Sequence, residues 1–270
     1  MPNVPGTGPI LRIHRRNHDP TPAYGPFHIL FTVFGFALCA FVAWKLRHIC
    51  EKKFNIILFC VGAVLALSEV FKQLFYYFAL CNNSYCWGEF PFQLCSVPMY
   101  LCLLLPVLKP GRLRQGALSF MVLYNLLGGA ISFAEPSGLL HGYWFLTVHA
   151  LIWHMSLVFI GLFIWFSKRG GTVMKDYWSA TATFVALCGI AFCLNFFVQN
   201  VLHEHMNMFF VGPGNSPIVV FSTFSEVLGW YWNTPIYIFA LSLGAYIVFC
   251  IIYLCQHKRL PFGSKQKAAA

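Results

Sequence analysis

Long apolar segments alternate with short polar ones along almost the whole chain. A bilayer core about 30 Å thick requires about 20 apolar residues of helix, and seven segments come close to or exceed that length. These segments run over 27–44, 54–80, 90–108, 114–134, 143–167, 179–201 and 234–255. They are continuous and lack the period-two alternation of strands, so the pattern favours helix. We predict an all-α polytopic membrane bundle of about seven transmembrane helices, which makes residues 27–255 one transmembrane domain.

Lysine and arginine are confined to every second connection between the predicted helices. They occur at 45–53, 109–114, 168–175 and 258–267 and are absent from the intervening connections. Cytoplasmic loops carry the excess of basic residues, so we predict a cytoplasmic C-terminus and an N-terminus outside. Three arginines in the N-terminal tail, residues 1–26, run against this rule. Residues 256–270 are then a basic cytoplasmic tail.

The chain carries a high net positive charge but very few charged residues in total. Hydrophobic residues make up 59% of the 270 and charged residues only 10%, whereas a soluble domain carries about 25% charged residues. The chain is therefore expected to be an integral multi-pass membrane protein. Its net charge of +10 follows from the topology and from contact with anionic lipid heads, so no nucleic-acid partner is expected.

Most of the eleven cysteines lie inside apolar segments, where free cysteine behaves as a small apolar residue. Cys81 and Cys86 differ because they bracket a short polar loop between the second and third predicted helices. If that loop faces an oxidising compartment, a disulfide between them is plausible.

Polar side chains inside the predicted helices form the candidate site, because such groups are costly in hydrocarbon and usually face a cavity or the protein interior. The set consists of Glu69, Lys72, Gln73, Gln93, Cys95, His149, Asn195 and Gln199. At 1.5 Å per helical residue, the estimated depths below the predicted outer ends of the helices are about 8 to 16 Å for Glu69, Lys72, Cys95, His149 and Asn195. One shared pocket in the outer half of the bilayer accounts for the set. For single members, structural roles stay open: an ion pair of Glu69 with Lys72, or an interhelical hydrogen bond from Asn195.

Cys95 carries the candidate chemistry. It lies in the first turns of its predicted helix, where the helix N-terminus and the nearby Lys72 would stabilise a thiolate. His149 lies at matching depth and is the candidate base. A cysteine and a histidine are the minimal pair for acyl transfer through a thioester. His154 is five residues further on, so it points about 140° away and is expected to pack against neighbouring helices.

The connection over residues 200–233 is long, apolar and broken by glycine and proline. Loops of this kind are often lids or binding loops, although a plain connector is the alternative. For residues 216–228, a short helix in the membrane interface and a plain connector are both compatible with the sequence.

Four short motifs resemble the YwaF family of bacterial integral membrane proteins. They are Ser-Glu-Val-Phe-Lys at 68–72, Phe-Gln-Leu-Cys at 92–95, Leu-Thr-Val-His at 146–149 and Gly-Trp-Tyr-Trp at 229–232. The same superfamily includes an animal transmembrane acyltransferase that remodels ether phospholipids. The resemblance implies acyl transfer by Cys95 and His149 on a membrane phospholipid or lysophospholipid, without a cofactor. Lys72, Gln73 or Asn195 would then bind the oxyanion or phosphate, with Glu69 holding Lys72.

Two other functions use the same residues differently. A transporter or lipid-binding protein would bind a polar solute in the pocket without a covalent step. A zinc hydrolase would draw its ligands from His141, His203, Glu204, His205 and Glu226, although alternate residues of a helix diverge and zinc requires three or four converging ligands. A retinal photoreceptor is excluded, because residues 234–255 contain no lysine for a Schiff base.

Overall fold

A computed structural model describes residues 22–213, 219–258 and 261. The described residues form helices and no strands. Six helices are long and apolar enough to cross a membrane, and the protein is thus an integral multi-pass membrane protein. They are α2 (Pro26–Lys45), α3 with η1 (Glu51–Leu80), α5 with η3 and α6 (Arg112–Ala134), α7 (Trp144–Phe166), α8 (Met174–Val201) and α10 (Trp230–His257). Shorter helices are α4 (Val97–Leu104), α9 (Val219–Leu228), η2 (Trp87–Glu89), η4 (Pro136–Gly138) and η5 (Met208–Phe210).

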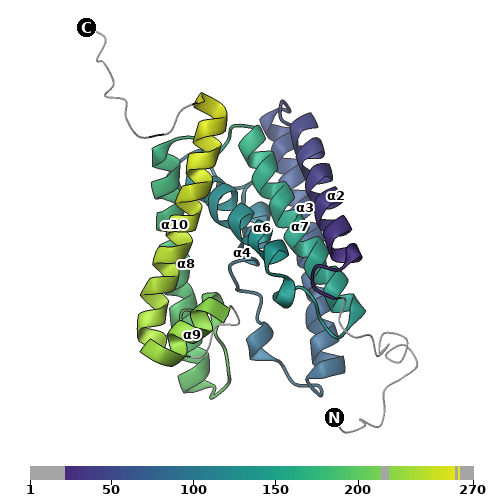
Figure 1. The fold of residues 1–270 in the computed structure, drawn as a ribbon, viewed down its shortest axis with the longest axis vertical. Helices are drawn as coiled ribbons and strands as arrows, with labels where there is room; N and C mark the ends of the chain where they lie inside the picture. Colours follow the sequence, from purple (N-terminus) through teal and green to yellow (C-terminus); the bar gives the residue numbers. More distant parts are fainter. Residues whose placement is uncertain (1–21, 214–218, 259–260, 262–270) are drawn as a thin grey trace.

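The third crossing is not a continuous helix. Residues 90–96 are non-helical, and only the eight residues of α4 follow as helix. The start of α2 and the end of α10 lie at opposite ends of the bundle (Figure 1), and six crossings alone would return the chain to the end where it began. Residues 90–104 therefore supply the seventh crossing, the first half as bends and turns and the second half as helix. The predicted helix over 90–108 is wrong in its first half and its last turn.

Proline and side-chain hydrogen bonds explain the non-helical half of this crossing. Pro91 has no backbone N–H to donate, and its carbonyl accepts a hydrogen bond of 2.8 Å from the Tyr100 hydroxyl. The Cys95 carbonyl accepts one of 2.9 Å from Trp153 Nε1 of α7. Irregular backbone survives at membrane depth only where protein or a cavity surrounds it, so this segment marks an interior site.

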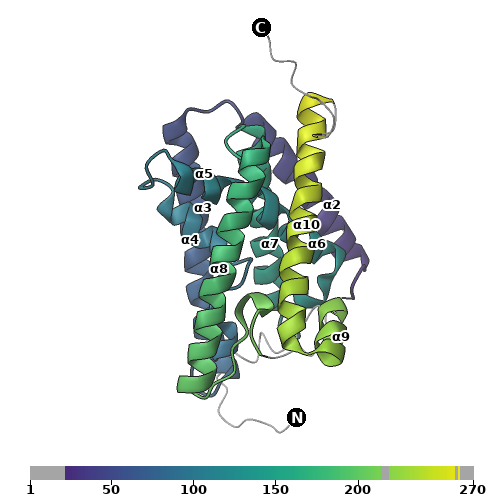
Figure 2. The same ribbon diagram turned by 90° about the vertical axis from the view of Figure 1, so that its left-hand side faces the viewer.

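Small residues let the helices approach closely around that segment. A side chain on Gly62 of α3 would meet Cys102 of α4 at 2.8 Å, and one on Gly161 of α7 would meet Leu126 of α6 at the same distance. Figure 2 shows α8 and α10 along one side of the bundle, with α9 folded at the foot of α10. The fold thus places α3, the 90–96 segment and α7 around a common interior.

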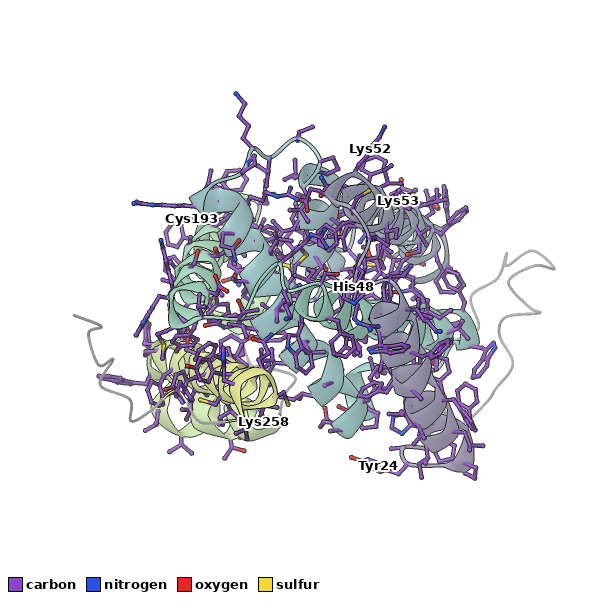
Figure 3. The ribbon with its side chains drawn as sticks, turned by 90° about the horizontal axis from the view of Figure 1, so that it is seen from above. Tyr24, His48, Lys52, Lys53, Cys193 and Lys258 are labelled. Atoms are coloured by element: carbon purple, nitrogen blue, oxygen red, sulfur yellow. A yellow bond between two sulfur atoms is a disulfide. The ribbon has the colours of Figure 1, made fainter. Side chains whose placement is uncertain are left out.

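The basic residues gather at the end of the bundle where α10 finishes. Figure 3 looks onto this end and labels Lys52, Lys53 and Lys258. The connections that carry lysine and arginine therefore lie at one end of the bundle, and the connections without them lie at the other. That this end faces the cytoplasm stays a prediction, and the three N-terminal arginines lie outside the described residues.

Arg114 ties three elements together at the basic end. Its guanidinium donates to the Leu105 carbonyl at 2.6 Å, to Glu51 at 2.5 Å and to Asn55 at 2.7 Å, and the residue is only 8% exposed. Glu51 also accepts a hydrogen bond of 2.8 Å from Arg169. The connections that precede α3, α5 and α8 are therefore held in one network.

Replacing Arg114 by Met should destabilise the protein by about 2 kcal/mol, because the buried Leu105 carbonyl and the half-buried Asn55 lose a charged donor. The decrease is measured as a lower midpoint of SDS-induced unfolding in mild detergent. Arg112→Met is the matched control, since Arg112 is exposed. Equal midpoints for the two variants would contradict a structural role for this network.

Candidate functional site

A cavity of about 220 Å³ lies between α3, the 88–96 segment, the connection before α7, and α7 itself. Its polar and aromatic lining consists of Glu69, Lys72, Tyr76, Glu89, Gln93, Cys95, Ser96, His141, His149, Trp153 and His154. We call this space the inner cavity. It brings together five residues that the sequence pointed to: Glu69, Lys72, Gln93, Cys95 and His149.

Cys95 and His149 both line the inner cavity, and Trp153 connects them. The indole of Trp153 donates to the Cys95 carbonyl, and its ring centroid lies 5.3 Å from that of His149. His149 Nε2 is buried and has no hydrogen-bond partner among the described residues. An unpaired buried nitrogen is costly, so this one is available for a ligand in the cavity.

Cys95 lies just before α4, in the membrane crossing formed by residues 90–104. It shares the wall of the inner cavity with Lys72 and Ser96. A nearby ammonium and the start of a helix both stabilise a thiolate. That they do so for Cys95 stays a prediction.

Lys72 is held between two carboxylates from different elements. Its Nζ lies 3.0 Å from Glu69 Oε1 and 3.9 Å from Glu89 Oε2. Gln73 donates to Glu69 at 2.7 Å and to the Glu89 carbonyl at 2.6 Å. Glu69 thus forms the ion pair foreseen as a structural alternative, while Gln73 lies behind it and does not line the cavity.

Gln93, Asn195 and Gln199 all bind the backbone of the connection after α8. Gln93 exchanges hydrogen bonds with Asn207 and Phe209, at 3.1 and 2.8 Å. Asn195 is fully buried, donates to the Met208 carbonyl at 2.9 Å and accepts from its N–H at 2.6 Å. Gln199 donates to the carbonyls of Met206 and Pro213. Asn195 and Gln199 do not line the inner cavity, and any support they give the site passes through this connection.

Asn195→Leu should destabilise the protein by about 2–4 kcal/mol, because each buried group of Met208 left unpaired costs about 1–3 kcal/mol. SDS-induced unfolding in mild detergent measures the loss. Asn200→Leu changes an exposed asparagine on the same helix and should stay within about 0.5 kcal/mol of wild type. A similar loss in both variants would argue against this role of Asn195.

The long connection after α8 begins exposed at residues 202–205 but is buried from Met206 to Phe209 and at Val211. Met206, Met208, Phe209 and Val211 are almost completely buried. The interfacial helix considered for 216–228 corresponds to α9, which begins at Val219, while residues 216–218 lie outside the described ones. A lid role stays a prediction.

A second, wider cavity of about 550 Å³ adjoins the first. The two share Tyr76, Gly88 and Glu89 in their walls. We call this space the vestibule. Cys81 and Cys86 form a disulfide in its wall, as the sequence allowed. The inner cavity thus continues toward the end of the bundle opposite the basic one, which is the predicted outer end.

Two ionisable residues of the inner cavity, Glu89 and His141, were not predicted to lie there, although His141 was considered as a zinc ligand. Burial is the largest influence on both: it raises the pKa of Glu89, and with the Lys72 ammonium it lowers the pKa of His141. Both lie in connections, where a charged residue is ordinarily solvated and gives no signal. His154, expected to pack elsewhere, also lines the cavity, although its Nδ1 is bonded to the Ala150 carbonyl at 2.8 Å.

The candidate zinc ligands are spread over different places. Glu204 and His205 line the vestibule, whereas His141 lines the inner cavity. Over residues 22–213, 219–258 and 261, no three His, Cys, Asp or Glu side chains converge as metal ligands would.

Comparison with known proteins identifies the family. The profile of the TMEM164 family matches residues 23–253. The chain belongs to the TMEM164 family. The match begins just before α2 and ends near the end of α10, so it covers both cavities and every helix that lines them. No curated protein and no solved structure matches the chain.

Proposed function

We propose that this TMEM164-family protein is a lipid acyltransferase in which Cys95 carries the acyl group and His149 is its base. One observation carries the proposal: Cys95 and His149 line the same cavity, and the buried Nε2 of His149 has no partner among the described residues. The resemblance to the YwaF family and to an animal phospholipid acyltransferase supports the same assignment.

The first half-reaction acylates the protein. His149 takes the proton of the Cys95 thiol, and the thiolate attacks the ester carbonyl of a phospholipid. The carbon–sulfur bond forms, the ester carbon–oxygen bond breaks, and the leaving lysophospholipid takes the proton from His149. Because a thiolate is a far stronger nucleophile than a neutral thiol, transfer of the thiol proton to a positioned base precedes attack.

The second half-reaction moves the acyl group to a lysophospholipid hydroxyl, whose oxygen forms the new ester as the thioester bond breaks. Both half-reactions place negative charge on the carbonyl oxygen. Lys72 is the ammonium that lines the inner cavity, and a cation at this point stabilises such charge. Glu69 and Gln73 hold Lys72 in place. Gln93 is bonded to the connection after α8, which Asn195 and Gln199 hold in turn.

The depth of the cavity suits a membrane lipid. Residues 90–95 are half-buried and Ser96 is buried, and the segment is bonded to α7 through Trp153. A phospholipid can bring its ester groups to this depth while its headgroup stays near the vestibule. We therefore assign a phospholipid as donor and a lysophospholipid as acceptor.

The proposal is tested with purified protein in vesicles that contain a phospholipid labelled in one acyl chain and an unlabelled lysophospholipid. We expect label in the product formed from the acceptor, which mass spectrometry identifies. A transporter or lipid-binding protein would move or retain the intact donor without passing its label on. Absence of labelled product with every donor and acceptor headgroup tried would contradict the acyltransferase assignment.

A further inference from the structure

Most polar groups of the inner cavity are already paired. Lys72 is bound by Glu69 and Glu89, both ends of the Gln93 amide are bonded, and His154 is tethered to its own helix. Among the described residues, no group forms a hydrogen bond with a ring nitrogen of His141 or His149. These two imidazoles are therefore the bases that remain free for a ligand.

The backbone of His141 is fixed although it lies in a connection. Its N–H donates to the Thr147 hydroxyl at 2.9 Å, and the same hydroxyl donates to the His141 carbonyl at 3.1 Å. Thr147 is 1% exposed in the first turns of α7. The helix that carries His149 thus also holds the backbone of His141.

The two imidazoles lie at different depths. His141 precedes the first residue of α7, Trp144, whereas His149 lies five residues after it, or about 7–8 Å along the helix axis. The inner cavity meets the vestibule at Tyr76, Gly88 and Glu89, toward the outer end. His141 is therefore on the side from which a polar acceptor arrives, and His149 on the deeper side with Cys95.

His141 is suited to accept a proton. Burial is the main cause that lowers its pKa below the ordinary value, and the nearby Lys72 ammonium adds to this. The ring is consequently neutral at physiological pH and has one nitrogen able to act as a base.

We propose that His141 is a second catalytic base, which activates the hydroxyl of the acyl acceptor while His149 serves the Cys95 thiol. This inference rests on the proposed acyltransferase function. One proton comes from the Cys95 thiol and the other from the acceptor hydroxyl. A separate base for each explains why the cavity presents two imidazoles at different depths that have no partner among the described residues.

In the deacylation step, His141 takes the proton of the acceptor hydroxyl, and the acceptor oxygen bonds to the thioester carbonyl carbon. The carbon–sulfur bond breaks, and the electron pair remains on Cys95 as thiolate. The thiolate takes one proton from cavity water, and His141 returns its proton to that water, so neither residue is changed.

The test measures the two half-reactions separately in the full-length protein. In His141→Gln, the thioester should form from labelled phospholipid at nearly the wild-type rate, while transfer to a lysophospholipid should slow about 10²–10⁴-fold, the usual contribution of a general base. Hydroxylamine, which attacks thioesters without a base, should release the label equally fast from variant and wild type. His203→Gln, an exposed histidine that lines neither cavity, should transfer within about twofold of wild type.

The outcomes separate the inference from the function it rests on. If wild type forms no thioester, both fail. Two results with a wild type that forms the thioester would refute only the second base. In one, His141→Gln transfers the acyl group at the wild-type rate. In the other, His141→Gln cannot be acylated although its unfolding midpoint is unchanged. Should His141→Gln fail to fold, added imidazole should restore transfer in His141→Ala, and absence of rescue in a folded His141→Ala would overturn the inference.

Discussion

Cys95→Ala should lower acyl transfer by about 10⁴-fold or more, as expected when a covalent nucleophile is removed. Without the sulfur no thioester can form, and the remaining cavity only binds lipid. The loss is measured as the rate at which label passes from phospholipid to lysophospholipid in vesicles. The fold should persist, because alanine keeps the Cys95 carbonyl that accepts from Trp153.

Cys193→Ala is the control for this variant. Cys193 is an exposed thiol on α8, and Figure 3 places it at the edge of the bundle. We expect its transfer rate to equal that of wild type. Transfer by Cys95→Ala at a comparable rate would show that no thioester on this residue is required, and the proposed mechanism would have to be abandoned.

His149→Gln should slow acylation of Cys95 by about 10²–10⁴-fold, since a general base contributes this much. The variant keeps a polar side chain of similar size but cannot take the thiol proton. The measurement is the rate of thioester formation from labelled phospholipid before any acceptor is added. Unlike His141→Gln, this variant should be impaired in the first half-reaction.

His48→Gln is the matched control, because His48 is exposed at the basic end of the bundle, where Figure 3 labels it. It should be acylated as fast as wild type. If His149→Gln were also acylated at that rate, another group would have to remove the thiol proton, and His154 would be the next candidate on the same helix.

Six of the seven membrane crossings could be predicted from the sequence, because uninterrupted apolar length is the main requirement for a spanning helix. The third crossing could not. Residues 90–108 are as apolar as the others, yet side chains remote in sequence, such as Trp153, satisfy the backbone there. Hydropathy does not register those long-range hydrogen bonds.

The candidate site was predictable where polar residues interrupt apolar helices. Glu69, Lys72, Cys95 and His149 were found in this way, and they meet in one cavity. Asn195 gave the same signal but binds a buried connection instead. A costly polar group inside a helix bundle shows that a partner exists, without showing whether that partner is a ligand or backbone.

Residues of connections gave no comparable signal. Glu89 and His141 reach the inner cavity only because their segments fold back over it, with Gln73 and Thr147 fixing their backbones. Such tertiary hydrogen bonds depend on the packing of α3 and α7. They leave no periodic pattern in the sequence.

The most direct test of the account is peptide mapping by mass spectrometry after one turnover with an acyl-labelled phospholipid and no acceptor. The account predicts one acyl group on the peptide that contains Cys95, removable by hydroxylamine and absent from the His149→Gln protein at the same time point. The proposed mechanism would be contradicted if lysophospholipid, added later, were converted to product while Cys95 had not been acylated, or while another residue carried the label instead.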